Sequence, residues 1–224
     1  MRTPVLWSLG LLLAATAPAL AAEPAVTTDE HKTFYALGLA IGQNLASFNL
    51  TAAELELVKV GLADAVLNRP RKAELPALMS KVQELQRQRL TAAAAVEKKA
   101  GQVFLDKAAG EKGATRMASG LILSVIKPGE GASPKSGDAV KVHYHGTLTD
   151  GTVFDSSVQR GEPATFPLTG VIPCFSEGLQ QMKVGGKSRL VCPADLAYGD
   201  KGAPPKIKPG ATLVFEIELL EIVK

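Results

Sequence analysis

The stretch Val140–Ser157, VKVHYHGTLTDGTVFDSS, decides how the second half of this chain folds. From Val140 to Tyr144 apolar residues alternate with polar ones, which is the period-2 pattern of a strand with one buried face. Asp150-Gly151 is expected to supply the positive-φ residues of a tight turn, after which Val153 begins a return strand. The stretch therefore predicts a β-hairpin.

One face of this hairpin is predicted to bring Tyr144, Phe154 and Asp155 together. An amphipathic hairpin with an aromatic core is the plain structural interpretation of the pattern. The carboxylate favours a second interpretation, because a charge beside a buried Phe costs free energy unless it is paired or hydrogen-bonded. These three residues are therefore candidates for a site.

Further strands are expected on either side of the hairpin, separated by Gly- and Pro-rich turns. Only one short helix is expected among them, with Phe175, Leu179 and Met182 on one side. Several antiparallel strands and one helix predict an α+β half-barrel, the sheet wrapped around the helix. The expected strands span residues 120–126, 139–148, 153–154, 165–168, 188–192 and 212–222.

The first half of the chain has the pattern of helices. Thr27-x-x-Glu30 and Thr51-x-x-Glu54 are capping-box candidates, and a third helix is expected from Leu75-Pro76 towards Gly110. Its apolar seam of Leu75, Leu78, Val82 and Leu85 does not continue beyond Leu90, so the second half is predicted to be a solvent-exposed spacer. Gly38 and Gly42 lie four apart on the first helix, which favours close approach of another helix. A small monomeric bundle and a homodimer are both compatible with these apolar faces.

The N-terminus has the three parts of a secretory signal: Arg2, a short apolar run, and small residues before an expected cleavage after Ala21 or Ala22. The run is too short to span a bilayer, so we expect an exported protein without a membrane span. We therefore divide the chain into a signal peptide (1–22), a helical domain (23–113) and a β-rich domain (114–224). With 25 Lys and Arg against 22 Asp and Glu, no nucleic-acid footprint is expected.

Four blocks of the second half resemble, in order, FKBP-type peptidyl-prolyl isomerases: VHYHGTLTDGTVFDSS, GVIPCFSEGLQQMKVGGK, LAYGDKGAP and PGATLVFEIELLEI. The helical half resembles the dimerisation arm of the macrophage infectivity potentiator and FkpA subgroup. The resemblance implies an FKBP-like fold, a homodimer through residues 23–113, a periplasmic or cell-surface location, and folding proteins with X–Pro bonds as substrates. It also makes macrolide inhibitors candidate ligands.

The resemblance further implies an apolar cleft for a proline ring. Its expected catalytic residues are Tyr144, Phe154, Asp155, Tyr198 and Phe215, and its expected substrate-binding residues are Phe166, Val171, Ile172 and Phe175. Phe175 stands where the family usually has Trp, and Ala203 stands where many members have His or another larger residue. Rotation of an X–Pro bond needs no nucleophile, proton transfer or cofactor, and neither a metal nor a cofactor is expected. A non-catalytic dimeric holdase and an adaptor for one fixed partner are the alternatives.

Cys174 and Cys192 are the two cysteines of the chain. Export and an even cysteine count favour a disulfide between them, and two buried thiols are the alternative. His143 and His145 are two apart on the polar face of a strand, a spacing that can hold a metal. No Cys or carboxylate lies close by in sequence, so a plain strand surface is the favoured interpretation.

Overall fold

The computed structural model describes residues 24–223. The chain divides into two compact units, residues 1–40 and residues 41–224. Helix α1 (Asp29–Leu45) begins in the first unit and ends in the second. The predicted signal peptide lies outside the described residues, and the predicted division at residue 113 remains a prediction.

The helical region contains α1, the 3₁₀ turn η1 (Ala46–Phe48), α2 (Ala52–Val66) and α3 (Leu75–Ala109). The predicted capping box of α2 is confirmed: Thr51 Oγ1 accepts from Glu54 N–H, and the Glu54 carboxylate accepts from Thr51 N–H at 2.8 Å. The one predicted at Thr27 is wrong. Helix α1 begins two residues later, and Thr28 Oγ1 accepts the N–H of His31 at 3.1 Å.

Large apolar side chains of this region remain exposed in the single chain. Phe34 is 64 % exposed and Leu57 is 74 % exposed. A Cβ built at Gly38 or Gly42 would meet nothing within 4 Å, so space for another helix is open beside both glycines. No helix among residues 24–223 is both long enough and apolar enough to cross a membrane.

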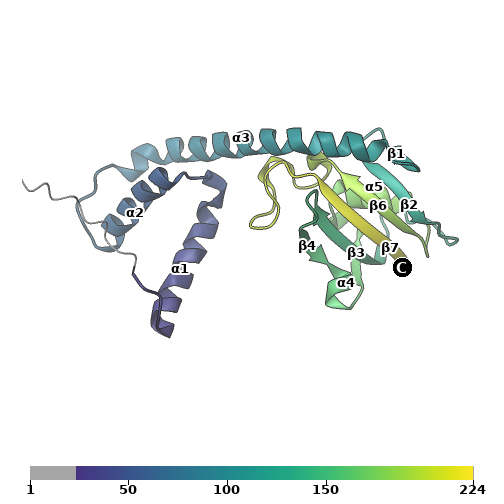
Figure 1. Cartoon of the computed structure of the whole chain (residues 1–224), viewed down its shortest axis with the longest axis horizontal. Coiled ribbons are helices and arrows are strands. Elements are labelled where there is room, and N and C mark those ends of the chain that lie inside the picture. The colour runs from purple at the N-terminus through teal and green to yellow at the C-terminus, as the bar shows by residue number, and fades with distance from the viewer. Residues whose placement is uncertain (1–23, 224) are drawn as a thin grey trace, which may run out of the picture. The chain divides into compact units, whose positions relative to one another are not determined.

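The second half forms one antiparallel sheet in the order β1-β2-β6-β7-β3-β4, with β5 also paired to β3 (Figure 1). The last strand in sequence, β7, lies in the middle of this sheet, between β6 and β3. The strands are β1 (Ala114–Arg116), β2 (Ile122–Lys127), β3 (Ala139–Leu148), β4 (Val153–Ser156), β5 (Ala164–Pro167), β6 (Lys187–Cys192) and β7 (Leu213–Val223).

Helix α5 (Pro173–Gln180) fills the concave side of the sheet, as predicted. Its residues Phe175 and Leu179 are buried in one core with alternate residues of β3, β6 and β7. Helix α4 (Ser157–Arg160) is a further short helix that was not predicted. Three 3₁₀ turns complete the domain: η2 (Leu168–Gly170), η3 (Ala194–Leu196) and η4 (Gly199–Lys201).

The predicted hairpin is β3 and β4. Gly151 has φ +87°, and Leu148 N–H donates to Thr152 O at 2.9 Å. Only Gly151 has a positive φ in this turn; Asp150 instead accepts the N–H of Thr152 at 2.8 Å, so the expectation of two positive-φ residues is wrong. An Asx-type turn needs only one such residue.

The expectation of a solvent-exposed second half of α3 is also wrong. Ala94, Gly101, Leu105 and Ala108 are buried at successive spacings of seven, four and three residues, which place them on one face of the helix. Leu105 and Ala108 form a second core with Ile122, Val191 and Val214, the residues of β2, β6 and β7 that point away from α5. The end of α3 therefore covers the convex face of the sheet.

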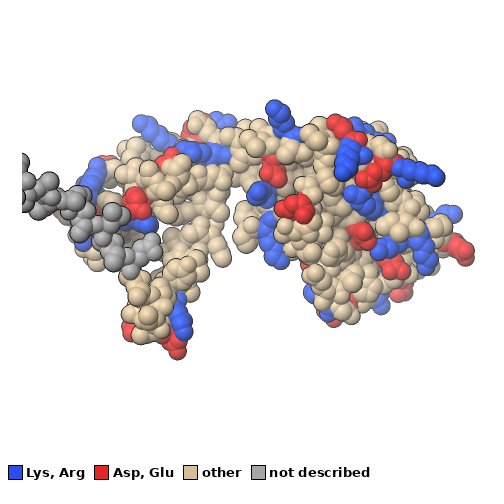
Figure 2. Space-filling model, in the orientation of Figure 1, with Lys and Arg blue, Asp and Glu red and all other residues tan. Residues whose placement is uncertain are grey.

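On the visible face of the molecule, Lys and Arg are interspersed with Asp and Glu (Figure 2). Ion pairs join α3 and the residues just after it to the strands: Arg116 pairs with Asp106 of α3 at 2.7 Å, and Arg189 pairs with Glu111, two residues beyond α3, at 2.7 Å. The Arg189 guanidinium also lies 5.9 Å from the centre of the Phe104 ring. These ion pairs therefore lie at the same contact between the end of α3 and the sheet as the second core.

Candidate active site

A cavity of about 300 Å³ opens between the hairpin, α5 and the loops that follow η2 and precede β7. It is lined by all nine residues named from the sequence and by one further residue, Gly170. The lining residues are Tyr144, Phe154, Asp155, Phe166, Gly170, Val171, Ile172, Phe175, Tyr198 and Phe215. A ligand the size of a proline ring fits such a volume.

Strand register brings the aromatic walls together. Gly146 of β3 is paired with Asp155 of β4 on one side and with Phe215 of β7 on the other. A Cβ at Gly146 would lie 2.7 Å from Phe154 Cζ and 3.1 Å from Phe215 Cε1. The glycine is therefore required for the close approach of the two rings, whose centroids are 5.5 Å apart in an edge-to-face arrangement.

Phe175 forms the floor of the cavity. It is 5 % exposed, and its ring centroid lies 5.9 Å from that of Tyr144, 6.1 Å from Phe166 and 5.4 Å from Phe215. All three contacts are edge-to-face or nearly so. The residue is preceded directly by Cys174, which the structure joins to Cys192 of β6 by a disulfide. The covalent link fixes the start of α5 on the sheet beneath the cavity.

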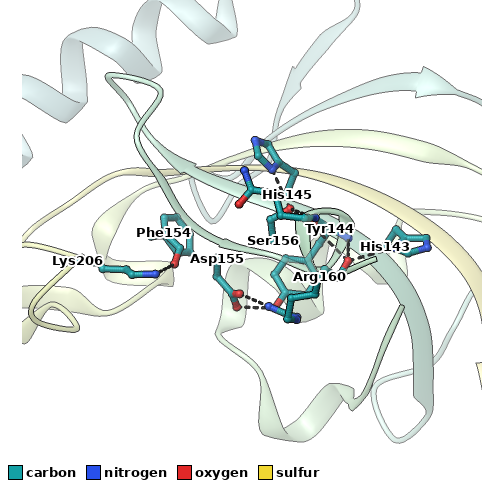
Figure 3. Close-up of polar contacts among 10 residues, drawn as sticks. His143, Tyr144, His145, Phe154, Asp155, Ser156, Arg160 and Lys206 are labelled. Carbon is teal, nitrogen blue, oxygen red and sulfur yellow. Dashed lines mark hydrogen bonds and ion pairs between the residues drawn. The ribbon is translucent and has the colours of Figure 1, made fainter. Parts of the chain in front are cut away.

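Asp155, the one carboxylate among the described residues that line the cavity, is held by two partners (Figure 3). Tyr144 Oη donates to Asp155 Oδ2 at 2.5 Å, and Arg160 of α4 forms an ion pair with the other carboxylate oxygen. Arg160 also donates to Tyr144 Oη at 3.0 Å, and its guanidinium carbon lies 5.6 Å from the centre of the Tyr144 ring. The three side chains form a closed triangle of polar contacts.

This triangle sets the charge states of its members. Burial raises the pKa of Asp155, but the hydrogen bonds from Tyr144 and Arg160 outweigh it, so the pKa lies below its ordinary value. Burial is also the main reason that the pKa of Tyr144 is raised, with Arg160 opposing it. At neutral pH the carboxylate is therefore charged and the phenol is neutral.

Arg160 and Lys206 are site residues that the sequence analysis missed. Lys206 Nζ donates to the carbonyl oxygen of Phe154 at 2.8 Å and so ties the loop before β7 to the hairpin (Figure 3). A basic residue five positions after Asp155 was the available signal for Arg160. Its use depends on the turn of α4, where Ser156 Oγ accepts the N–H of Gln159.

Two hydrogen-bonding groups at the cavity are available to a ligand. The Tyr198 side chain is 41 % exposed, and its hydroxyl forms no hydrogen bond with any of residues 24–223. The N–H of Ile172, at the start of α5, likewise donates to no group in the described part of the chain. Ala203, the second departure from the family pattern, pairs its backbone with Ile207 in the loop beyond Tyr198.

The polar face of β3 is occupied by hydrogen bonds to serines. His143 Nδ1 lies 3.3 Å from Ser157 Oγ, and His145 Nδ1 lies 3.0 Å from Ser156 Oγ (Figure 3). Within residues 24–223 no group of three or more His, Cys, Asp or Glu is arranged to hold a metal. The cavity itself holds apolar walls, one paired carboxylate and two free donors, a set suited to binding an apolar ring attached to a carbonyl.

Comparisons with known proteins agree with this geometry. Residues 130–220 match the family model of FKBP-type peptidyl-prolyl cis-trans isomerase, and residues 30–125 match that of the domain amino terminal to FKBP-type peptidyl-prolyl isomerase. The chain is 43 % identical to the FKBP-type 22 kDa peptidyl-prolyl cis-trans isomerase of Escherichia coli, over 89 % of this chain and 98 % of that protein.

Two further relatives cover most of the chain. The peptidyl-prolyl cis-trans isomerase Mip of Coxiella burnetii is 35 % identical over 97 % of this chain and 96 % of its own length. The crystal structure of FkpA from Escherichia coli superposes with a TM-score of 0.64 at 36 % identity, covering 88 % of this chain and 98 % of that one. The predicted fold class is thereby confirmed, and the chain belongs to the family of FKBP-type peptidyl-prolyl cis-trans isomerases.

Proposed function

We propose that the cavity between Tyr144, Phe154 and Phe215 is the site where this isomerase binds X–Pro bonds and accelerates their cis–trans rotation. The observation that carries the proposal is its lining: aromatic and aliphatic walls, with a single carboxylate that is already paired. A proline ring fits against the floor at Phe175, and the preceding carbonyl then lies near the two free donors at the rim. Phe166, Val171 and Ile172 complete the contact with the ring.

Desolvation explains how such a cavity lowers the barrier. Amide resonance holds the X–Pro bond planar with a barrier of about 18–20 kcal/mol. The planar amide is more dipolar than the twisted one, so water stabilises it more. Apolar walls remove that water and favour the twisted state. The Tyr198 hydroxyl and the Ile172 N–H are the groups proposed to hold the substrate carbonyls.

Asp155 is proposed to orient the wall, not to exchange a proton. Its two oxygens are occupied by Tyr144 and Arg160, so it fixes the Tyr144 ring in the cavity wall. Its negative charge also contributes to the field in the cavity. The role of the triangle is thus to keep a polar corner rigid inside an apolar site.

A protease-coupled assay on a proline-containing tetrapeptide tests this assignment. Phe154→Ala and Asp155→Ala are each expected to lower kcat/KM about tenfold or more, which corresponds to roughly 1.4 kcal/mol of transition-state stabilisation. Val158→Ala, an exposed position on α4, is the matched control and is expected to keep full activity. Unchanged activity of Phe154→Ala would show that the cavity is not the site.

Phe175→Trp tests the floor in the opposite direction. Trp is the usual residue of the family at this position, and it enlarges the aromatic surface under the proline ring. We expect activity equal to or higher than that of the unchanged chain in the same peptide assay. A loss of tenfold or more would mean that the surrounding rings leave no room for the larger side chain.

We further propose that the protein is exported, acts in the periplasm as a homodimer and binds unfolded or folding clients. Support comes from the signal-like N-terminus and from the exposed apolar side chains of α1 and α2. Residues 23–113 are proposed to form the dimer and residues 114–224 the isomerase domain. Cleavage after Ala21 or Ala22 is checked by the mass of the mature protein from a periplasmic extract.

Chaperone activity is the second proposed function, and the exposed apolar surface of the helical region favours it. Refolding of a proline-limited protein separates it from catalysis. Phe154→Ala is expected to lose the acceleration of the proline-limited phase while still suppressing aggregation of an unfolded client. Loss of both effects together would place client binding in the isomerase cavity alone.

A further inference from the structure

Helix α3 lies against the loop that carries Tyr198. This loop, residues 194–210, contains η3, Tyr198 and η4 and ends shortly before β7; we call it the Tyr198 loop. It contributes Tyr198 to the cavity wall, from outside the sheet and α5. Contacts between α3 and both its turns and its end are present in the structure.

Lys98 of α3 joins two carboxylates of this loop. Its Nζ lies 2.7 Å from Asp195 Oδ1 and 2.8 Å from Asp200 Oδ1. The two aspartates are three residues before and two residues after Tyr198. One ammonium group thus holds the loop on both sides of the residue that lines the cavity.

The fit beneath this ion pair is close. Ala94, one turn before Lys98, is 2 % exposed, and a Cβ at Gly210 would overlap its carbonyl oxygen. Gly101 meets Thr212 in the same way. Gly210 N–H donates to Gly199 O at 2.9 Å, so the end of the loop is tied to the start of η4, next to Tyr198.

The position of Tyr198 therefore depends on its backbone. Its hydroxyl has no hydrogen-bond partner among the described residues, and 41 % of the side chain is exposed. On its far side the loop is held by Lys206, which donates to Phe154 O. Without the Lys98 ammonium, Asp195 and Asp200 would both lose that counter-charge and repel each other. The hydrogen bonds to these aspartates also raise the pKa of Lys98, which keeps it charged.

We propose that Lys98 is a positioning residue for the isomerase site, which holds the Tyr198 loop on α3 and thereby places the Tyr198 hydroxyl at the substrate carbonyl. The proposal rests on the role of Tyr198 proposed above. On this proposal the second half of α3 belongs functionally to the isomerase domain, although α3 contributes no residue to the cavity lining.

The test uses the full mature chain with three variants. Lys98→Met keeps the helix former and the aliphatic stem but removes the charge. Lys98→Arg keeps the charge, and Lys99→Met is the matched control, because exposed Lys99 forms no ion pair with any of residues 24–223. Two readouts are compared: hydrogen exchange of peptides from residues 194–210, and kcat and KM on a proline tetrapeptide.

In Lys98→Met, the amide hydrogens of the Tyr198 loop are expected to exchange faster, whereas those of β3 are expected to be unchanged. The same variant is expected to lower kcat/KM about threefold or more. Lys98→Arg and Lys99→Met are expected to behave like the unchanged chain. In a Tyr198→Phe background Lys98→Met is expected to cause little further loss, because its effect passes through the hydroxyl. An Asp195→Asn, Asp200→Asn double variant is expected to reproduce Lys98→Met.

Unchanged exchange of residues 194–210 in Lys98→Met, or unchanged kinetics, overturns the proposal. So does a Lys98→Met effect of full size in the Tyr198→Phe background. A different result would show that the proposed active site itself is wrong: a Tyr198→Phe or Phe154→Ala chain that keeps full activity on the tetrapeptide. The exchange experiment still decides in that case whether Lys98 holds the loop.

Discussion

At the scale of single residues, Gly146 determines how closely the cavity walls approach. It lies on β3, paired with Asp155 of β4 on one side and with Phe215 of β7 on the other. The edge of the Phe154 ring occupies the space where its side chain would stand. A residue without chemistry of its own therefore shapes the site as much as the residues that line it.

Gly146→Ala is expected to lower kcat/KM at least tenfold, because Phe154 or Phe215 must leave its position. Overpacking of this kind also costs about 1–3 kcal/mol of unfolding free energy. Urea denaturation and the peptide assay measure the two effects. Gly137→Ala is the control, since a Cβ there meets nothing within 4 Å. Equal activity of both variants would contradict the close approach.

The triangle of Tyr144, Asp155 and Arg160 predicts a flat pH profile. Between pH 6 and pH 8 the lowered pKa keeps Asp155 charged and the raised pKa keeps Tyr144 neutral. Because bond rotation transfers no proton, kcat/KM is expected to change little across this window. A bell-shaped profile there would reveal a titrating group that the mechanism lacks.

The same triangle makes the stability of the folded protein depend on pH under acid conditions. A folded-state pKa below the unfolded value of about 3.9 makes Asp155 stabilising above that pH, and the contribution disappears as pH falls through the folded value. The stability difference between the unchanged chain and Asp155→Asn is therefore expected to be present at pH 7 and to shrink below about pH 4. Thermal unfolding of the two proteins across that range checks the sign.

At the scale of elements, the second half of α3 belongs with the sheet that it covers. Leu105 packs on Ile122, Val191 and Val214, and Lys98 pairs with the Tyr198 loop. A fragment of residues 114–224 loses this cover, whereas one of residues 91–224 keeps it. We expect both to fold, the shorter with an unfolding free energy lower by roughly 2 kcal/mol or more, the order of one large buried side chain.

Chemical denaturation of the two fragments measures this difference, and the peptide assay compares their sites. The longer fragment is expected to match the activity of the full chain on short peptides. The shorter one is expected to be less active, because its Tyr198 loop has lost Lys98. Equal stability of the two fragments would mean that the convex face needs no cover.

Six of the seven strands and the nine cavity-lining residues named from the sequence could be predicted because each depends on local information, whereas the short strand β1 was not predicted. Period-2 alternation and turn residues mark the hairpin, and the family blocks carry eight of the nine predicted site residues, with Phe166 lying between two blocks. Arg160, Lys206 and Lys98 could not be found in this way, since each acts on a residue placed by the tertiary fold. Arg160 lies five positions after Asp155, but this spacing brings the two together only through the turn of α4. The pairings of Lys206 and Lys98 have no signature in spacing.

The cover provided by α3 did leave a signal. Three strands contain consecutive apolar residues where a one-sided sheet would alternate: Leu121-Ile122-Leu123, Leu190-Val191-Cys192 and Leu213-Val214-Phe215. Burial on both faces explains them, because the middle residue of each run meets α3 and its neighbours meet α5. The helix side was harder to recognise, because alanine and glycine make up three of its four buried residues.

At the scale of the whole molecule, the helical region is incomplete as a single chain. Phe34 and Leu37 on α1 are 64 % and 59 % exposed, an unfavourable arrangement for large apolar side chains in water. We expect the mature protein to be a dimer at micromolar concentration, as measured by sedimentation or light scattering.

Phe34→Glu together with Leu37→Glu is expected to give a monomer with unchanged kcat/KM per site on tetrapeptides. Its effect on protein refolding should fall, since two linked sites no longer raise the effective concentration of a client. Ala36→Glu, a neighbouring position on a different face of α1, controls for added charge. A dimer that survives the double substitution would place the contact elsewhere.

The central place of β7 has a consequence for the timing of folding during synthesis. Residues 213–223 fill the gap between β6 and β3, and every neighbour they pair with is made earlier. Before β7 is made, β6 and β3 each have an unpaired edge where β7 will lie, and the cavity is not closed. The isomerase fold is therefore completed only when its last strand is free, and a nascent chain stays incompletely folded until then, as the export proposed above requires.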